Sequence, residues 1–224
     1  MTVKAVVFDF FGTLTKPIST DHHRLHLTPV AEALGCPPAD FHEAWSTSFY
    51  ARATRSWGTP AEALRRALEH LPLDLSDTVI ERALAVRTSL FGEYIDLRPD
   101  AISTLRALRQ RGIKVAVLSD CTDDLPTMWP TLPLADLVDS TVFSYEHGAH
   151  KPDPTLYAAA ATALGVLASD CLYVGDGGSD ELAGAERVGM RAVRIAADGH
   201  LGYGHVPWDG PVIGSLSEVL DLAR

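Results

Sequence analysis

Four residues of this sequence carry side chains that could act together in one reactive site. Asp9, Ser119 and Asp176 each stand at the end of a short apolar run, and Lys151 precedes the helix start Asp153-Pro154. They lie far apart in the sequence, but the carboxyl ends of parallel strands share one edge of a sheet. The pattern predicts a single site with two carboxylates, a hydroxyl and an amine.

The apolar runs that must position these residues are nearly continuous. They cover residues 3–8, 113–118, 140–144, 171–174 and 191–196. Continuous runs are typical of parallel strands that are buried on both faces. Helical patterns lie between them, at residues 99–111, 153–164 and 180–188. This βαβαβ order predicts a doubly wound α/β core with a Rossmann-like parallel sheet and right-handed crossovers.

Residues 16–98 interrupt this alternation, because they contain helical patterns and no convincing strand. The helical patterns lie at residues 28–34, 38–56, 59–71 and 76–93. We therefore predict a core formed by residues 1–15 and 99–224, and an inserted helical cap domain at 16–98. An insertion after the first strand lies above the carboxyl edge of the sheet, where open α/β proteins bind ligands.

The composition limits the classes of partner. The chain has 224 residues, 46% of them hydrophobic, and a formal net charge of −10. This negative charge disfavours nucleic acid and anionic membrane surfaces. No apolar run reaches the ~20 residues of a membrane span or resembles a signal peptide. The three cysteines show no metal or disulfide spacing. We expect a cytoplasmic protein that is monomeric or homodimeric.

Four segments resemble the motifs of the haloacid dehalogenase-like (HAD) hydrolases that carry a helical cap of the first insertion type. They read VVFDFFGTLT at 6–15, VLSD at 117–120, HKPDPTLY at 150–157 and YVGDGGSDEL at 173–182. The resemblance spans the whole chain, with the predicted cap in the expected gap. It implies a hydrolase, most simply a phosphatase of small phosphorylated metabolites.

The resemblance assigns a role to each acidic residue. Asp9 would be the nucleophile that forms a covalent aspartyl intermediate. Mg²⁺ would be held by Asp9, Asp176 and the backbone carbonyl of Phe11, since this ion prefers oxygen ligands. Asp180 would support the metal directly or through water. Glu181 is the weaker candidate for that role.

The remaining polar residues would bind the substrate. Ser119 would donate its hydroxyl to a phosphoryl oxygen, and Asp120 would lie beside it. Lys151 would neutralise charge on the nucleophile and on the phosphoryl group. Positioning and charge stabilisation of this kind dominate phosphoryl transfer.

Phe11 departs from the pattern of HAD phosphatases, which usually carry a second aspartate at this position. That aspartate protonates the leaving group, and general acid–base catalysis contributes about 10²–10⁴-fold. A phenyl ring cannot transfer a proton. A substrate with a good leaving group, or a proton from His22, His23, His147 or His150, would compensate.

Phe11 also keeps other functions open. The 2-haloacid dehalogenases have an aromatic residue here, but their second motif reads Ser-Asn and their fourth is metal-free. A phosphonatase needs a lysine in the cap helices, where this chain has none. A binding or regulatory protein on a HAD scaffold is a further alternative. The cap aromatics are predicted to form cap core more than substrate wall; they are Phe41, Trp45, Phe49, Tyr50 and Trp57.

Overall fold

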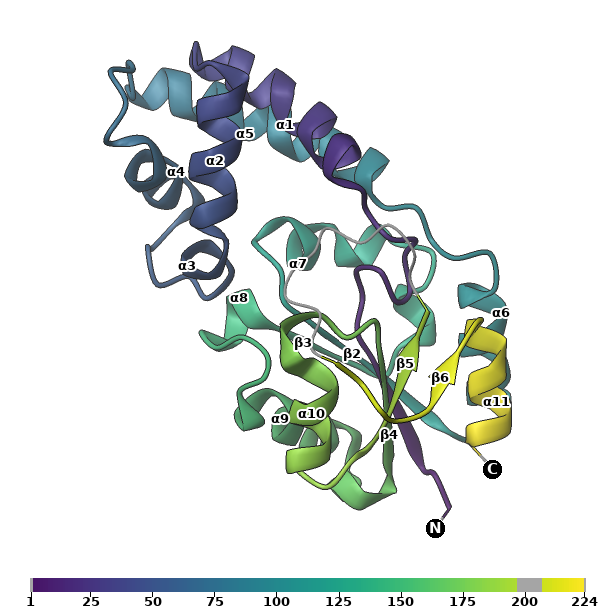
Figure 1. Ribbon diagram of the computed structural model, residues 1–224. Helices are drawn as coiled ribbons and strands as arrows, with labels where there is room; N and C mark the ends of the chain where they lie inside the picture. Colours follow the sequence, from purple (N-terminus) through teal and green to yellow (C-terminus); the bar gives the residue numbers. More distant parts are fainter. Residues whose placement is uncertain (1, 197–206, 224) are drawn as a thin grey trace.

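The core of the protein is a six-stranded, fully parallel sheet in the order β3-β2-β1-β4-β5-β6 (Figure 1). The computed structural model describes residues 2–196 and 207–223. The strands are β1 (Ala5–Phe8), β2 (Lys114–Ser119), β3 (Ser140–Phe143), β4 (Cys171–Gly175), β5 (Arg191–Ile195) and β6 (Val212–Ile213). Five of them match the predicted runs to within two residues at either end, and the short edge strand β6 was not predicted.

Helices cover both faces of the sheet, which confirms the doubly wound α/β prediction. The core helices are α6 (Ala101–Gln110), α7 (Asp124–Met128), α8 (Ser144–His147), α9 (Pro154–Leu164), α10 (Glu181–Arg187) and α11 (Val219–Leu222). Residues of α6, α7 and α11 pack on one face, and residues of α9 and α10 pack on the other.

Strand β1 shows why its sequence is continuously apolar. All four of its side chains are fully buried. Val6 and Phe8 point into the cluster beneath α6, while Ala5 and Val7 point into the cluster beneath α9. Both faces of a central parallel strand are covered by helices, so alternate polar residues have no place in it.

Residues 20–91 form a separate helical unit above the sheet, which we call the helical insertion (Figure 1). It contains α1 (Thr20–Leu34), α2 (Pro38–Thr47), α3 (Phe49–Ala53), α4 (Pro60–Leu68) and α5 (Asp77–Phe91). These helices bury a cluster of their own around Phe41, Leu64 and Ile80. A short 3-10 turn, Gly92–Tyr94, leads back to the core.

Two predicted helix boundaries in this insertion were wrong. Helix α1 begins at Thr20 rather than 28, because the Ser19 side chain caps it by accepting from the His22 backbone amide, and the helix accommodates Pro29. The predicted helix 38–56 divides at Ser48, which leaves the helical conformation with φ −89° and ψ 3°.

The two chain crossings between insertion and core lie side by side. Thr15 and Leu97 form an antiparallel bridge, and Lys16 pairs with Asp96 at 2.7 Å. The domain boundaries at 15/16 and 98/99 stay a prediction. The glycine-rich stretch 199–210, whose sequence predicts a surface loop, falls largely outside the described residues. Within the part of the chain that the structure describes, no helix is long and apolar enough to cross a membrane.

Candidate active site

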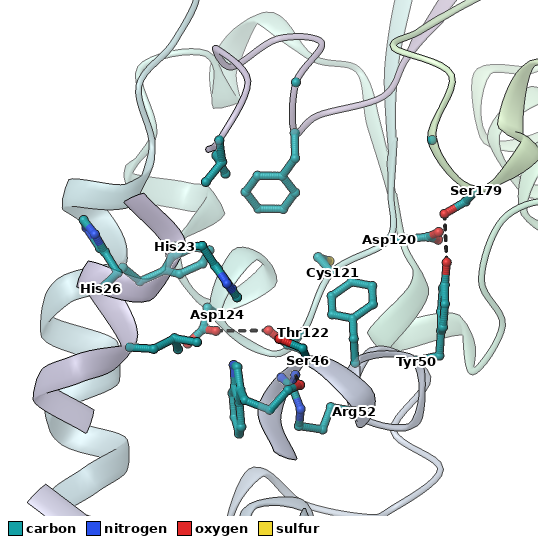
Figure 2. Close-up of a pocket in the computed structure, with 18 of the residues that line it drawn as sticks. His23, His26, Ser46, Tyr50, Arg52, Asp120, Cys121, Thr122, Asp124 and Ser179 are labelled. Carbon is teal, nitrogen blue, oxygen red and sulfur yellow. Dashed lines mark hydrogen bonds between the residues drawn. The ribbon is translucent and has the colours of Figure 1, made fainter. Parts of the chain in front are cut away.

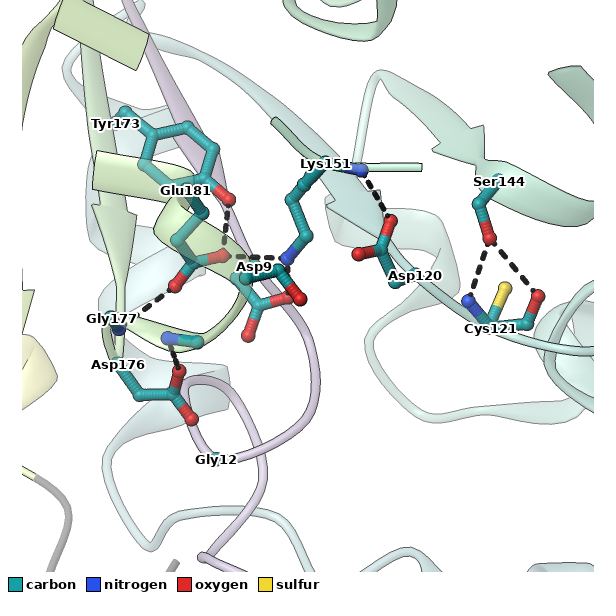
Figure 3. Close-up of polar contacts among 12 residues, drawn as sticks. Asp9, Gly12, Asp120, Cys121, Ser144, Lys151, Tyr173, Asp176, Gly177 and Glu181 are labelled. Atoms are coloured by element: carbon teal, nitrogen blue, oxygen red, sulfur yellow. Dashed lines mark hydrogen bonds and ion pairs between the residues drawn. The ribbon is translucent and has the colours of Figure 1, made fainter. Parts of the chain in front are cut away.

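The carboxyl edge of the sheet brings the sequence-predicted residues together. Phe8 lies in register with Val117 of β2 and Val174 of β4. The polar residues therefore follow one or two positions past the same level of three adjacent strands: Asp9, Ser119 and Asp176. Lys151 reaches this edge from the loop before α9 (Figure 3).

Lys151 joins two buried carboxylates. Its Nζ donates to Asp9 Oδ1 and to Glu181 Oε2, each at 2.6 Å, and all three residues are almost completely buried (Figure 3). Burial alone would lower the pKa of Lys151. The charges of Asp9 and Glu181 outweigh burial and raise the pKa well above its usual value, so the amine is charged.

Glu181 is held in place by several donors besides Lys151. Its Oε2 accepts from the Tyr173 hydroxyl at 2.7 Å, and its Oε1 accepts from the Gly177 amide at 3.0 Å. Burial raises the pKa of Glu181 to about 8 despite the opposing charge of Lys151. Burial likewise raises the pKa of Asp9 to about 6. Both carboxyl groups therefore pay a desolvation penalty that a bound cation would offset.

Three carboxylates form a cluster that fits a divalent metal. Asp9, Asp176 and Glu181 each place an oxygen within 4.8 Å of the others, and all three are buried. The Asp176 Oδ1 also accepts from the Gly178 amide at 2.9 Å. Oxygen donors at this spacing and of this charge are the ligands that Mg²⁺ prefers. The donor set therefore fits the ion that the sequence predicts.

Glu181, rather than Asp180, contributes the third carboxylate of this cluster. Asp180 is not part of this cluster, and its Oδ2 accepts from both terminal nitrogens of Arg187 at 3.1 Å. Ser179 and Asp180 both adopt left-handed backbone, with φ values of 55° and 52°. These two residues turn the chain so that the next side chain points inward. Two consecutive left-handed residues are rare, and the spacing of the motif alone gives no sign of them.

The two residues at the end of β2 differ in their position. Ser119 is fully buried, and its Oγ has no hydrogen-bond partner among the residues that the structure describes. Asp120 lines the pocket, and its Oδ1 accepts from the backbone amide of Lys151 at 2.9 Å. Asp120 thus fixes the Lys151 backbone, and burial raises its pKa.

A pocket of about 200 Å³ separates this cluster from the helical insertion (Figure 2). Its core side includes Asp9, Lys151 and Asp176, and its walls are mostly apolar. Three of the cap aromatics line it, namely Trp45, Phe49 and Tyr50. Phe41 and Trp45 lie in the buried cluster of the insertion. Trp45 therefore contributes both to this cluster and to the pocket wall.

Phe11 forms part of the pocket wall, close in sequence to Asp9. Its ring meets Phe10 edge-on at 5.0 Å between centroids and Phe91 of the insertion at 6.5 Å. Of the four histidines predicted as proton donors, His23 lines the pocket. The others lie differently: His22 stacks on His26, His147 ends α8, and His150 packs on Tyr50.

Three sets of contacts hold the insertion closed over the pocket. Arg87 of α5 donates to Asp123 and Thr122 and pairs with Asp124. Tyr50 shares a hydrogen bond of 3.1 Å with Ser179. The buried Ser144 hydroxyl donates to the Ala53 carbonyl at 2.9 Å. These contacts join the insertion to the core.

Together, the doubly wound sheet, the buried carboxylates at its edge and the helical insertion define an α/β protein with an acidic site. Comparison with known proteins narrows the class. The profile of the haloacid dehalogenase-like hydrolases matches residues 3–189. The chain belongs to this family, which confirms the resemblance found in the motifs.

The relatives of this chain within the family include phosphatases and 2-haloacid dehalogenases. The chain is 31% identical to the phosphatase MT3486 of Mycobacterium tuberculosis, over 100% of this chain and 99% of the relative. It is 29% identical to (S)-2-haloacid dehalogenase 4A of Burkholderia cepacia, over 89% and 85%. The crystal structure of a 2-haloacid dehalogenase from Pseudomonas syringae matches with TM-score 0.67 and 26% identity, over 98% and 97%.

Proposed function

We propose that this hydrolase is a Mg²⁺-dependent phosphatase that acts on a small phosphorylated metabolite through an aspartyl-phosphate intermediate. The observation that carries the proposal is the buried cluster of Asp9, Asp176 and Glu181 beside Lys151. Three buried carboxylates within 4.8 Å of one another favour a bound divalent cation, and this cation together with Lys151 would favour an anionic substrate over a neutral one. The phosphatase relative that covers the full chain supports the same choice.

Asp9 performs the covalent step. One of its carboxylate oxygens forms a bond to phosphorus while the bond to the leaving oxygen breaks. Water then attacks the aspartyl phosphate, releasing inorganic phosphate and restoring the carboxylate. Bound Mg²⁺ supplies positive charge for the phosphoryl oxygens. Asp9, Asp176 and Glu181 would hold it together with the Phe11 carbonyl, and Asp180 would act at most through water.

Lys151 and Ser119 prepare the phosphoryl group for attack. The Lys151 ammonium is already within hydrogen-bond distance of the nucleophile, so it orients the Asp9 carboxylate and offsets the charge of the substrate. The Ser119 hydroxyl, which is buried at the end of β2, donates to a phosphoryl oxygen once the group binds. Asp120 holds the backbone of Lys151 in place.

Metal binding gives a direct prediction that separates Glu181 from Asp180. Mg²⁺ at about a hundred times its Kd should stabilise the fold by about 3 kcal/mol, or several degrees in Tm. Glu181→Gln should remove most of this shift. Asp180→Asn should retain it, because Asp180 pairs with Arg187 and asparagine tolerates the same left-handed backbone. Thermal denaturation with Mg²⁺ or EDTA measures both; a shift lost in Asp180→Asn and kept in Glu181→Gln reverses the assignment.

Phe11 predicts a preference for substrates with good leaving groups. Restoring a proton donor with Phe11→Asp should raise kcat/KM for simple alkyl phosphates by at least about tenfold, the lower part of what acid catalysis contributes. Phe11→Asn is the matched control, since asparagine is polar and similar in size to aspartate but transfers no proton. Rates on alkyl and aryl phosphates measure the effect. An unchanged rate with Phe11→Asp would mean that another group already supplies the proton.

A 2-haloacid dehalogenase is the second candidate, and two observations favour it. The aromatic Phe11 lies in an apolar pocket wall, and the Lys151–Asp9 pair orients the nucleophile without a metal. One experiment decides between the two functions. The protein is incubated with a panel of phosphate esters plus Mg²⁺, and with 2-chloropropionate plus EDTA. Phosphate release supports the phosphatase; chloride release without metal, and no phosphate from any ester, overturns it.

We also propose that the helical insertion is a cap that opens and closes over the substrate. The contacts of Arg87, Tyr50 and Ser144 across the pocket support this role. Closure excludes water from the phosphoryl transfer. The pocket volume and the negative charge of the chain are consistent with a small-molecule substrate rather than with a nucleic acid.

A further inference from the structure

The carboxyl group of Asp120, directly after β2, has two oxygens with different surroundings. Its Oδ1 accepts from the backbone amide of Lys151 at 2.9 Å (Figure 3). Its Oδ2 is buried and has no hydrogen-bond partner within residues 2–196 and 207–223. A buried polar atom of this kind is costly unless a water or a ligand bonds to it. One oxygen of Asp120 therefore positions Lys151, and the other is available to a bound water.

Lys151 places Asp120 close to the proposed nucleophile. Its backbone amide contacts Asp120, and its Nζ contacts Asp9 Oδ1 at 2.6 Å, so the two acids lie at opposite ends of one lysine. Both acids line the same pocket. Ser119, the proposed donor to the phosphoryl group, directly precedes Asp120 in the chain. A phosphoryl group that is bonded to Asp9 and accepts from Ser119 and Lys151 is therefore held next to Asp120.

Two hydroxyl groups lie beside Asp120 where the insertion meets the core. Tyr50 of α3 and Ser179 share a hydrogen bond of 3.1 Å, and the Asp120 carboxyl group lies next to it (Figure 2). All three residues line the pocket. A water molecule bound in a protein typically has about three polar partners. The carboxylate and the two hydroxyls supply such a set, so this corner of the pocket suits a positioned water.

The surroundings of Asp120 make it a stronger base than an exposed aspartate. Burial is the largest influence and raises the pKa of Asp120. The charges of Lys151 and His150 oppose this effect and favour the ionised form. A carboxylate with a raised pKa takes a proton from water more readily, as a general base must.

The other acidic and histidine side chains of the pocket are engaged elsewhere or are weaker bases. Asp124 pairs with Arg87, and the remaining carboxylates belong to the cluster that fits the metal. Burial lowers the pKa of His23 to about 4 and also lowers the pKa of His26. Among the described residues that line the pocket, Asp120 is thus the best placed to accept a proton.

We propose that Asp120 is the general base that activates water in the second half of the reaction. The inference rests on the proposed phosphatase and completes it. Phe11 leaves the first half without an acid, so good leaving groups are favoured there. The aspartyl phosphate that follows is the same for every substrate, and its hydrolysis needs an activated water.

The step balances with the groups of this site. The water oxygen forms a bond to phosphorus while the bond between phosphorus and the Asp9 oxygen breaks. One proton of the water passes to Asp120 Oδ2. Asp9 regains its carboxylate, inorganic phosphate leaves, and the proton on Asp120 then returns to solvent.

Pre-steady-state kinetics of Asp120→Asn with 4-nitrophenyl phosphate and Mg²⁺ test this role. We expect a burst of about one nitrophenolate per site at a rate close to that of wild type. The steady-state rate should then be lower than that of wild type by at least about 10²-fold, the lower part of what a general base contributes. Acid quenching should trap the accumulated phosphoryl group on the peptide that contains Asp9. The burst amplitude also counts the correctly folded sites.

The substitution separates a base from a residue that only positions Lys151. Asparagine keeps an Oδ1 that accepts from the Lys151 amide, so a purely positioning role predicts an almost unchanged steady-state rate. Asp139→Asn is the matched control. Asp139 accepts from the Val115 amide at 2.8 Å but lies outside the pocket lining, so this variant should behave as wild type. A measurement without any variant is the decay of the wild-type aspartyl phosphate, which should be slower in D₂O than in H₂O.

The outcomes distinguish this inference from the proposed function. If wild type hydrolyses the ester and Asp120→Asn keeps its steady-state rate, or loses burst and steady state equally, the base is wrong and the phosphatase stands. Equal decay of the aspartyl phosphate in D₂O and H₂O also overturns the base. If wild type releases no nitrophenolate, the phosphatase fails and the base fails with it, because no aspartyl phosphate forms.

Discussion

Replacing Asp9 with asparagine is expected to lower phosphate-ester hydrolysis by at least about 10⁴-fold, because the covalent route depends on this one carboxylate. The amide cannot form the aspartyl phosphate and is a much weaker nucleophile. Rapid quenching of the wild type with a fast substrate should also trap a phosphoryl group on the peptide that contains Asp9. The same peptide from Asp9→Asn should stay unmodified.

The substitution should leave the fold intact, which makes the loss of rate interpretable. Asparagine has the shape of aspartate and can still accept from Lys151 Nζ through its Oδ1. The substitution also removes a buried carboxyl group whose pKa is raised by burial. Asp136→Asn is the matched control, since Asp136 is exposed and lies outside the pocket lining. Full activity in Asp9→Asn would exclude Asp9 as the nucleophile, whatever the other site residues do.

The sequence predicted those parts of the structure that depend on local patterns. Strand β1 was found because both faces of Ala-Val-Val-Phe are buried, so that no polar residue interrupts it. The same reasoning placed Asp9 and Asp176 at one edge, since both follow central strands of the sheet. Helix α9 starts and ends where the pattern at 153–164 predicts: Asp153 caps its start by accepting from the Thr155 amide, and Gly165 ends it in the left-handed conformation.

The parts that the sequence could not decide depend on backbone geometry or on tertiary packing. Glu181, the weaker candidate of the sequence analysis, joins the carboxylate cluster because Ser179 and Asp180 adopt left-handed φ values, which no residue type specifies uniquely. Arg52 and Arg87 belong to different helices of the insertion, and only the packing of those helices brings both to one pocket. Helical periodicity identifies a buried face but does not say which neighbour it meets.

Lys151→Met is expected to have the largest effect on stability of any substitution in the site. It leaves Asp9 and Glu181 buried without their shared cation, and breaking a buried pair in this way costs about 3–5 kcal/mol. Lys4→Met is the matched control: Lys4 also pairs with an aspartate, Asp170, at 2.8 Å, but is exposed, so it should cost at most about 1 kcal/mol. Urea denaturation in EDTA compares the two variants with wild type.

The penalty of Lys151→Met should depend on pH in a defined direction. Burial already raises the folded-state pKa of Asp9 to about 6 and of Glu181 to about 8, above the value of about 4 in an unfolded chain. Removing Lys151 raises both further, so the folded variant binds protons that the unfolded chain releases. The free energy of unfolding of Lys151→Met therefore comes closest to that of wild type at about pH 5. The difference between the two grows as pH rises through about 8. The Lys4→Met difference should stay flat over this range. An equal penalty for Lys151→Met at both pH values would assign its cost to lost packing and would contradict a role for Lys151 in neutralising the carboxylates.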